Sequence, residues 1–190
     1  MPGNRNVKNV QEHIIISPIG HFDPHLIRQV VQEVHRITGY DALAASVLQD
    51  VDFAFEPSRD QHWSTPILEK LADAAPPRAV KILAICSVDL FIPILTFVYG
   101  EAQLGGKACI ISTHRLSEGL GTARSDIFIR RVVKEAIHEL GHTFNLRHCK
   151  DHNCCMHYCR TIKDVDRKTH HLCRYCKVLL EDEMKSMSTI

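Results

Sequence analysis

The spacing of hydrophobic and polar positions predicts a chain that alternates between strands and helices. Residues 13–19 form a β-branched run closed by Pro18 and Gly20, which indicates a strand. Residues 24–38 carry apolar side chains at helical spacing and are followed by Gly39, so this segment predicts a helix. The same criteria predict a partial strand in 42–55, a loop at 59–65, strands at 80–87, 97–106 and 107–112, and short helices at 67–75 and 178–187.

A longer helix is predicted at 127–145, and the character of the chain changes after His148. The apolar stripe of this helix contains Val133, Ile137, Leu140 and Phe144. Beyond His148 the periodicity fades, and Cys and His become frequent. We therefore expect an α+β fold with a mixed twisted sheet. It would form a single domain over 1–190, with an α/β-like N-terminal lobe, 1–148, and a small C-terminal lobe, 149–190.

Composition changes this picture through histidine and cysteine. The chain has 190 residues, of which 45% are hydrophobic and 24% charged, as is ordinary for a globular protein. Its net charge of +1 lacks the basic excess of a nucleic-acid-binding protein, so we expect no nucleic-acid partner. The 13 histidines and 8 cysteines are unusual, and most of the cysteines lie in 149–176. Clustered cysteines beside histidines favour metal binding over disulfides.

The apolar segments favour a cytoplasmic protein without a membrane partner. Residues 1–9 are polar and lack the apolar segment of a signal peptide. The longest apolar run, 88–98, is too short to span a bilayer and contains Asp89 and Pro93. A reducing compartment would keep the cysteines as thiols, which strengthens the interpretation that they bind metal.

The predicted long helix contains the sequence His138-Glu139-Leu140-Gly141-His142. Residues four apart lie about one turn apart on the same helix face, so His138 and His142 can approach one zinc ion. Glu139 is rotated by about 100° around the helix, from where its carboxylate can reach a water on the metal without being a ligand. A surface helix with incidental histidines is the alternative interpretation of this motif alone.

Residues after the helix favour the metal site over that alternative. Asn145 tolerates the left-handed backbone conformation that ends a helix, so the chain can turn and bring His148 back as a third ligand. Met156 follows eight residues after His148.

The cysteines suggest a second metal site. Cys173 and Cys176 form a CxxC half-site, and thiolates in sets of four hold structural zinc. Cys149 and Cys154 supply a plausible other half. Either Cys155 or Cys159 could replace Cys154, and buried thiols without a metal are the alternative to the whole site. Such a site would stabilise a C-terminal lobe that has few apolar residues.

The extended histidine pattern resembles the metzincin clan of zinc peptidases, in which HExxHxxGxxH is followed by a Met-turn. Asn145 stands where the clan has Gly. The resemblance implies a catalytic zinc ion on His138, His142 and His148, and Glu139 as general base. It also implies that Met156 forms an apolar floor under the site.

The histidine motif is followed by Cys149, a second Cys, a CxM sequence and a distant CxxC. This pattern is similar to that of the narrower archaemetzincin family. Segment 97–116 resembles the strand region before the active-site helix of this family, and 59–64 resembles its R-x-Q loop more loosely. The resemblance implies a second, structural zinc ion, so we expect two zinc ions per chain. The residues that would hold the second ion are Cys149, Cys154, Cys173 and Cys176.

The resemblance implies a zinc metallopeptidase, either an aminopeptidase or an endopeptidase, that acts on peptides or proteins. Tyr158 follows Met156 as in the astacin branch of the clan, which implies a hydrogen bond to the tetrahedral intermediate. In metzincins an extended substrate pairs with an edge strand, and here we expect that strand at 108–112.

Two other functions remain open. The first is a metzincin-fold zinc protein with little turnover that acts as a peptide-binding or interaction module. The second is a zinc-knuckle interaction protein in which HExxH is incidental. The intact Glu139 favours the peptidase, because a binding module needs no general base.

Overall fold

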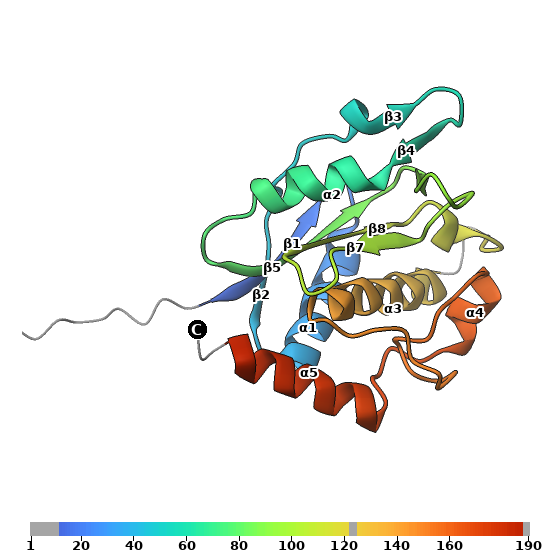
Figure 1. Cartoon of the computed structure of the whole chain (residues 1–190). Helices are drawn as coiled ribbons and strands as arrows, with labels where there is room; N and C mark the ends of the chain where they lie inside the picture. Colours follow the sequence, from blue (N-terminus) through green and yellow to red (C-terminus); the bar gives the residue numbers. More distant parts are fainter. Residues whose placement is uncertain (1–11, 122–124, 188–190) are drawn as a thin grey trace, which may run out of the picture.

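The structure, a computed structural model, describes residues 12–121 and 125–187 and shows a layered α+β fold (Figure 1). Within the described residues, the main sheet contains five strands in the order β2-β1-β5-β8-β7. They are β1 (His13–Pro18), β2 (Asp41–Ala44), β5 (Ala79–Cys86), β7 (Gly100–Ala102) and β8 (Ala108–Ser112). All pairs are parallel except β7 with β8, which is antiparallel. The expected α+β class with a mixed sheet is confirmed.

Helices cover both faces of this sheet (Figure 1). On one face lie α1 (Pro24–Thr38) and α3 (Ser125–Thr143), and on the other lies α2 (Ser64–Asp73). The C-terminal segment contributes α4 (Ile162–Arg167) and α5 (Arg174–Met187) on the side of α1 and α3. A small second sheet contains β3 (Phe55–Glu56), β4 (Gln61–Trp63) and β6 (Leu90–Phe91), and two 3₁₀ turns span Asp52–Ala54 and Arg115–Ser117.

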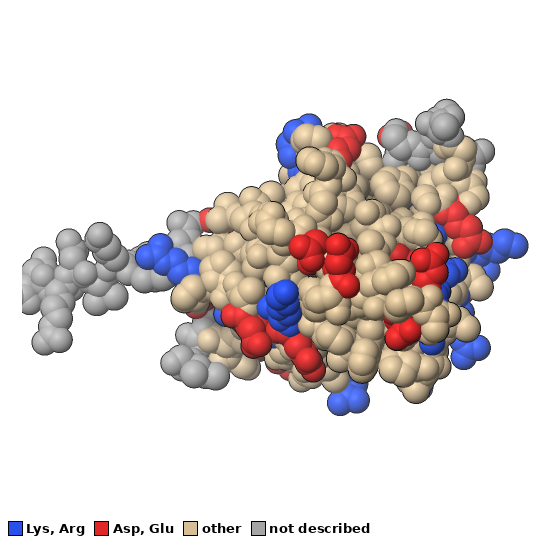
Figure 2. Space-filling model, turned by 90° about the horizontal axis from the view of Figure 1, so that it is seen from above, with Lys and Arg blue, Asp and Glu red and all other residues tan. Residues whose placement is uncertain are grey.

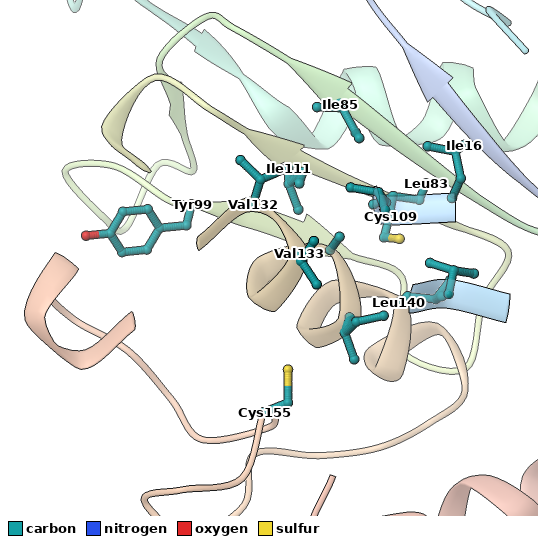
Figure 3. Packing of buried hydrophobic residues seen from close by; sticks show 14 of the residues in the cluster. Ile16, Leu83, Ile85, Tyr99, Cys109, Ile111, Val132, Val133, Leu140 and Cys155 are labelled. Carbon is teal, nitrogen blue, oxygen red and sulfur yellow. The ribbon is translucent and has the colours of Figure 1, made fainter. Parts of the chain in front are cut away.

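The core lies on both faces of the sheet because its central strands are apolar at nearly every position. In β5, Leu83 and Ile85 pack against α1 and α3, whereas Ile82 and Ala84 pack against the α2 side. Figure 3 shows the first of these layers, in which sheet residues face apolar side chains of α3 such as Leu140. This packing fixes α3, the helix with the HExxH sequence, beneath the sheet.

The opposite face of α3 is polar and holds the C-terminal segment. Arg131 donates two hydrogen bonds to the Asp166 carboxylate, at 2.7 and 2.8 Å. Lys134 Nζ donates to the Val165 carbonyl oxygen at 2.8 Å. These α3 residues are buried together with His138, and their spacing places them on one helix stripe. The stripe thus fixes the segment after residue 149 against the long helix.

The prediction that segment 108–112 is an edge strand is wrong. Segment 108–112 forms β8, which lies between β5 and β7 and is buried at every position. The edge is β7, whose Gly100 pairs with Ile111 of β8. The apolar character of β8 is that of an internal strand, because an edge strand normally carries polar side chains.

Other boundaries also differ from the expected ones. The expected loop at 59–65 contains β4 and the first residues of α2, and α5 begins at Arg174 rather than at 178. Helix α4 was not expected, although Thr161 and Asp164 form a capping box at its start that the sequence contains. The polar stretch 1–9 lies outside the described residues.

None of the helices in the described residues combines the length and the apolar character needed to cross a membrane. On the face shown in Figure 2, acidic and basic side chains are interspersed.

The sheet core predicts a large difference between two leucine substitutions. Leu83→Ala removes a fully buried side chain between β5 and the helices, and it should lower the free energy of unfolding by about 2–5 kcal/mol. Leu43→Ala is the matched control, because Leu43 on β2 is 49% exposed, and it should change stability by about 0.5 kcal/mol or less. Urea denaturation measures both, and equal effects would contradict this description of the core.

Candidate active site and metal centres

The three predicted histidine ligands meet at one point beside the end of α3. His138 and His142 lie one turn apart on the helix, and their Nε2 atoms are 3.2 Å apart. Asn145 then adopts a left-handed conformation with φ 62°, as expected, and the chain turns back. The His148 ring centroid comes to 5.3 Å from that of His138 and 4.9 Å from that of His142. The three residues can therefore offer nitrogen atoms to one metal ion.

Backbone carbonyls orient the two helical imidazoles. His138 Nδ1 lies 2.9 Å from the Cys155 carbonyl oxygen, and His142 Nδ1 lies 2.7 Å from that of Leu146. A carbonyl only accepts, so each Nδ1 carries the proton and each Nε2 has a free lone pair. Two lone pairs that face each other at 3.2 Å repel unless a cation lies between them. Tetrahedral zinc with Zn–N bonds of about 2.05 Å separates two ligands by about 3.3 Å, which fits.

The protonation state of these residues also suits a metal. Burial, followed by the nearby positive charge of Lys168, lowers the pKa of His138 well below its ordinary value. Burial lowers the pKa of His142 as well, and that of His148 to about 4. Neutral imidazoles bind metals, whereas protonated ones do not, so all three are prepared for coordination at neutral pH.

Glu139 lies beside the histidines and directly against the edge strand β7. A Cβ atom on Gly100 would come within 2.6 Å of Glu139 Cγ, so only glycine allows the strand to pass this close to the carboxylate. Burial raises the pKa of Glu139 well above its ordinary value, and the negative charge of Glu135 adds to this effect. This environment favours a carboxyl group that takes up a proton.

Met156 and Tyr158 occupy different positions around this site. Met156 is fully buried, and its Sδ atom lies where a side chain on Gly141 would stand, at 2.5 Å from the added Cβ. It therefore packs against the helix that carries the histidines. The Tyr158 ring lies 5.0 Å from the His148 ring and is 43% exposed at the opening of the site.

A buried ion pair beneath His138 was not predicted from the sequence. Lys168 Nζ lies 2.8 Å from Glu135 Oε1, and both side chains are buried. The same ammonium group lies 3.4 Å from His138 Nδ1. Burial is the largest effect and acts to lower the pKa of Lys168, but the charge and hydrogen bond of Glu135 together with the nearby Cys155 and Cys159 raise it above its ordinary value, so the lysine is charged. A lysine in a polar segment is normally solvated, and no local pattern around Lys168 predicts a buried partner.

The second cluster contains the four cysteines that the family resemblance selected. Those whose sulfur atoms gather are Cys149, Cys154, Cys173 and Cys176. The Sγ atoms of Cys149 and Cys173 are 3.8 Å apart, and tetrahedral zinc with Zn–S bonds of about 2.3 Å requires about 3.8 Å. The Cys173 amide donates to Cys154 Sγ at 3.3 Å, and the Cys176 amide donates to Cys173 Sγ at 3.5 Å. Such bonds stabilise thiolates, so the donor set fits zinc.

The competing cysteines point elsewhere. Cys155 Sγ donates to the Lys134 carbonyl oxygen at 3.2 Å and is fully buried under α3. Cys159 lines the cleft above the histidines. All eight cysteines are free thiols in the structure.

The histidine cluster forms the floor of an open cleft with a volume of about 510 Å³. Glu135, Glu139, Tyr158 and Arg160 also line the cleft, together with residues of segment 92–99, most of which are apolar. An HExxH helix with a third histidine, set under the edge strand of a sheet, is the arrangement of zinc metallopeptidases.

Comparisons with known proteins agree with this class. The sequence model of Peptidase family M54 matches residues 74–182. The archaemetzincin of Halobacterium salinarum (strain ATCC 29341 / DSM 671 / R1) is 34% identical over 167 residues, which are 85% of this chain and 95% of that protein. The archaemetzincin of Archaeoglobus fulgidus is 42% identical over 122 residues, 64% of this chain and 70% of that protein.

Solved structures give the same result. The crystal structure of archaemetzincin from Methanopyrus kandleri matches with a TM-score of 0.81 and 28% identity, over 94% of this chain and 98% of that chain. That of Archaeoglobus fulgidus, complexed with malonate, matches with a TM-score of 0.72 and 33% identity, over 88% and 99%. The chain belongs to the archaemetzincin family, peptidase family M54, which confirms the resemblance seen in the sequence and supports zinc metallopeptidase activity.

The buried ion pair predicts a stability loss that a second substitution restores. Lys168→Met leaves the Glu135 carboxylate buried without a counter-charge and should lower the free energy of unfolding by about 3–5 kcal/mol. The double variant Lys168→Met/Glu135→Leu should regain most of that loss. Lys163→Met, on the exposed side of α4, is the control and should have an effect of about 0.5 kcal/mol. Urea denaturation of the zinc-loaded protein measures all three, and similar stabilities of the two lysine variants would exclude a structural role for the pair.

Proposed function

We propose that the protein hydrolyses peptide bonds with a water molecule that a zinc ion activates and with Glu139 as general base. The observation that carries this proposal is the pair of facing Nε2 lone pairs of His138 and His142, with His148 nearby and Glu139 adjacent. When bound there, zinc would supply Lewis-acid activation of both the water and the scissile carbonyl.

The protein's own residues would perform the remaining tasks. The Glu139 carboxylate, held in a buried position against Gly100, would accept the proton of the attacking water and deliver it to the leaving amine. The Tyr158 hydroxyl would donate a hydrogen bond to the tetrahedral intermediate, a role that its place beside His148 at the cleft supports.

The second zinc ion would be structural. The four clustered cysteines would hold it with no free coordination position, and its site lies in the segment that also orients the catalytic histidines. We therefore propose two zinc ions per chain in a single domain, with lobes divided near His148. The free thiols support a cytoplasmic location.

A metzincin-fold zinc protein with little turnover, acting as a peptide-binding module, is the second candidate. The open cleft would serve either function. The buried Glu139 favours the peptidase, because burying a carboxyl group lowers stability and a binding module gains nothing from it. Aminopeptidase and endopeptidase activity both remain compatible with this geometry.

The general-base role predicts the behaviour of a nearly isosteric variant. Glu139→Gln should retain both zinc ions, because Glu139 is no ligand in this proposal, and should lower kcat for peptide hydrolysis by about 10²–10⁴-fold. Glu69→Gln, exposed on α2, should keep wild-type activity. Cleavage of an unblocked peptide library followed by mass spectrometry measures both, and equal cleavage by wild type and Glu139→Gln would reject the proposal.

The cysteine cluster predicts a change in zinc content. Cys173→Ser should lower the zinc content of the purified protein by about one ion per chain and loosen the C-terminal segment. Cys159→Ser should leave the zinc content unchanged, since Cys159 lies outside the cluster. Metal analysis by mass spectrometry distinguishes the two variants, and loss of zinc from Cys159→Ser alone would refute the ligand assignment.

A further inference from the structure

One side of the cleft is an apolar wall, defined here as the side chains of Ile92, Leu95, Phe97 and Tyr99. The wall belongs to the connection between β6 and β7 and leads directly into Gly100, which touches Glu139. Phe97 and Tyr99 pack edge to face, with ring centroids 5.4 Å apart. Tyr99 belongs to the buried cluster drawn in Figure 3 and is 7% exposed. The wall is thus continuous with the catalytic floor.

Side chains hold the middle of this connection, whereas Val98 and Tyr99 at its end are bonded to the backbone of Leu90 in β6 and Ser112 in β8. Arg59 Nη2 donates to the carbonyl oxygens of Leu95 and Thr96, at 2.9 and 3.1 Å. Gln61 Nε2 donates to the same Thr96 oxygen at 3.0 Å, and Gln61 Oε1 accepts a bond from Arg59 Nε at 3.0 Å. These are the two residues of the R-x-Q loop seen in the sequence.

A second pair of residues, Asp89 and Arg115, supports Arg59 and Gln61. Gln61 Nε2 also donates to Asp89 Oδ2 at 2.8 Å, and Arg115 donates to both Asp89 oxygens, at 2.7 and 2.6 Å. Burial acts to raise the pKa of Asp89, but the bonds from Arg115 and Gln61 hold it below its ordinary value. The Arg115 guanidinium carbon lies 4.1 Å from the centroid of the Phe97 ring in the wall. The network of Arg59, Gln61, Asp89 and Arg115 is termed the clamp.

The clamp keeps apolar side chains beside water. Leu95 remains 39% exposed and Ile94 is 86% exposed, so neither is held by burial in the core. Without the bonds from the clamp, the connection would turn its apolar residues toward the core, because exposing them to water is unfavourable. The charged bonds from Arg59 to the backbone of Leu95 and Thr96 fix the position of the connection in advance, which lowers the entropic cost of binding a ligand.

We propose that the clamp holds the apolar wall in place as a specificity subsite that selects peptides with a large apolar side chain next to the scissile bond. Arg59 and Gln61 are then positioning residues, which act through the backbone of Leu95 and Thr96. Most side chains of segment 92–99 that line the cleft are apolar or aromatic, with Thr96 as the polar exception, so the occupant is apolar. This inference rests on the proposed peptidase function.

Two neighbouring apolar residues give a matched test of the wall. Leu95 lines the cleft, whereas Ile94 is 86% exposed and is not among the residues that line it. The measurement is kcat/KM for a pair of peptides that differ only in Leu or Ser beside the scissile bond. Wild type and Ile94→Ser should prefer the Leu peptide by about tenfold or more, and Leu95→Ser should lose most of this preference. No preference in wild type, or equal effects of the two variants, would overturn the proposal.

The clamp is tested with Arg59→Ala and Gln61→Glu, the second of which replaces a donor by a carboxylate beside Asp89. Both should raise KM for the Leu peptide by about tenfold and leave kcat for the Ser peptide and the zinc content nearly unchanged. Arg59→Lys should restore part of the preference. Arg78→Ala is the control, because Arg78 is exposed and directly precedes β5. An unchanged preference in the clamp variants contradicts their positioning role, and if these variants do not fold, the Leu95 and Ile94 pair decides.

Binding without turnover separates this inference from the peptidase proposal. The zinc-loaded Glu139→Gln variant should bind the Leu peptide more tightly than the Ser peptide in calorimetry, and adding Leu95→Ser should abolish the difference. If wild type cleaves nothing but this binding preference holds, the peptidase proposal fails and the subsite stands. If wild type cleaves both peptides equally and Glu139→Gln binds both equally, the subsite fails and the peptidase stands.

Discussion

Helix α3 has to be buried on two opposite sides, and most of the structure follows from this constraint. Its apolar stripe packs against β5 and β8, and its polar stripe binds the C-terminal segment. Buried polar groups stabilise a protein only when each has a partner, so Arg131, Lys134 and Glu135 require Asp166, Val165 and Lys168. The histidines lie at the end of the same stripe. A well-placed C-terminal segment is therefore a condition for a well-placed active site.

The two candidate metal centres are coupled through this segment. The Cys149 amide donates to the Met156 carbonyl oxygen at 2.9 Å, and the Cys155 carbonyl oxygen accepts the bond from His138 Nδ1. A cysteine of one cluster, the methionine beneath the helix and the orientation of a histidine of the other cluster are thus joined within a few residues. Zinc bound by cysteines would order this short segment, which has little apolar surface of its own. The structural centre would then set the geometry of the catalytic one.

The strongest periodic and motif signals in the sequence were sufficient for α1, β5 and α3, and for the approach of His138 and His142, because these features depend on local spacing. The set of Cys149, Cys154, Cys173 and Cys176 came instead from the family resemblance, since spacing alone left Cys155 and Cys159 as alternatives. The position of β8 depends on strand order, which is a property of the whole sheet, so the expected edge was wrong. The pair Lys168 and Glu135 joins residues that are far apart in the chain, and no local pattern distinguishes a buried lysine from a solvated one.

The corrected strand order also changes how a substrate would meet the site. With β7 at the edge, the free backbone nearest Glu139 belongs to Gly100 and its neighbours, and not to the buried β8. An extended peptide that adds to this short edge would pass over the histidines with its side chains directed alternately toward and away from the cleft. The apolar wall precedes the same strand, so backbone pairing and side-chain selection would come from one continuous stretch of chain. Because β7 offers few backbone groups, the wall would have to provide much of the binding energy.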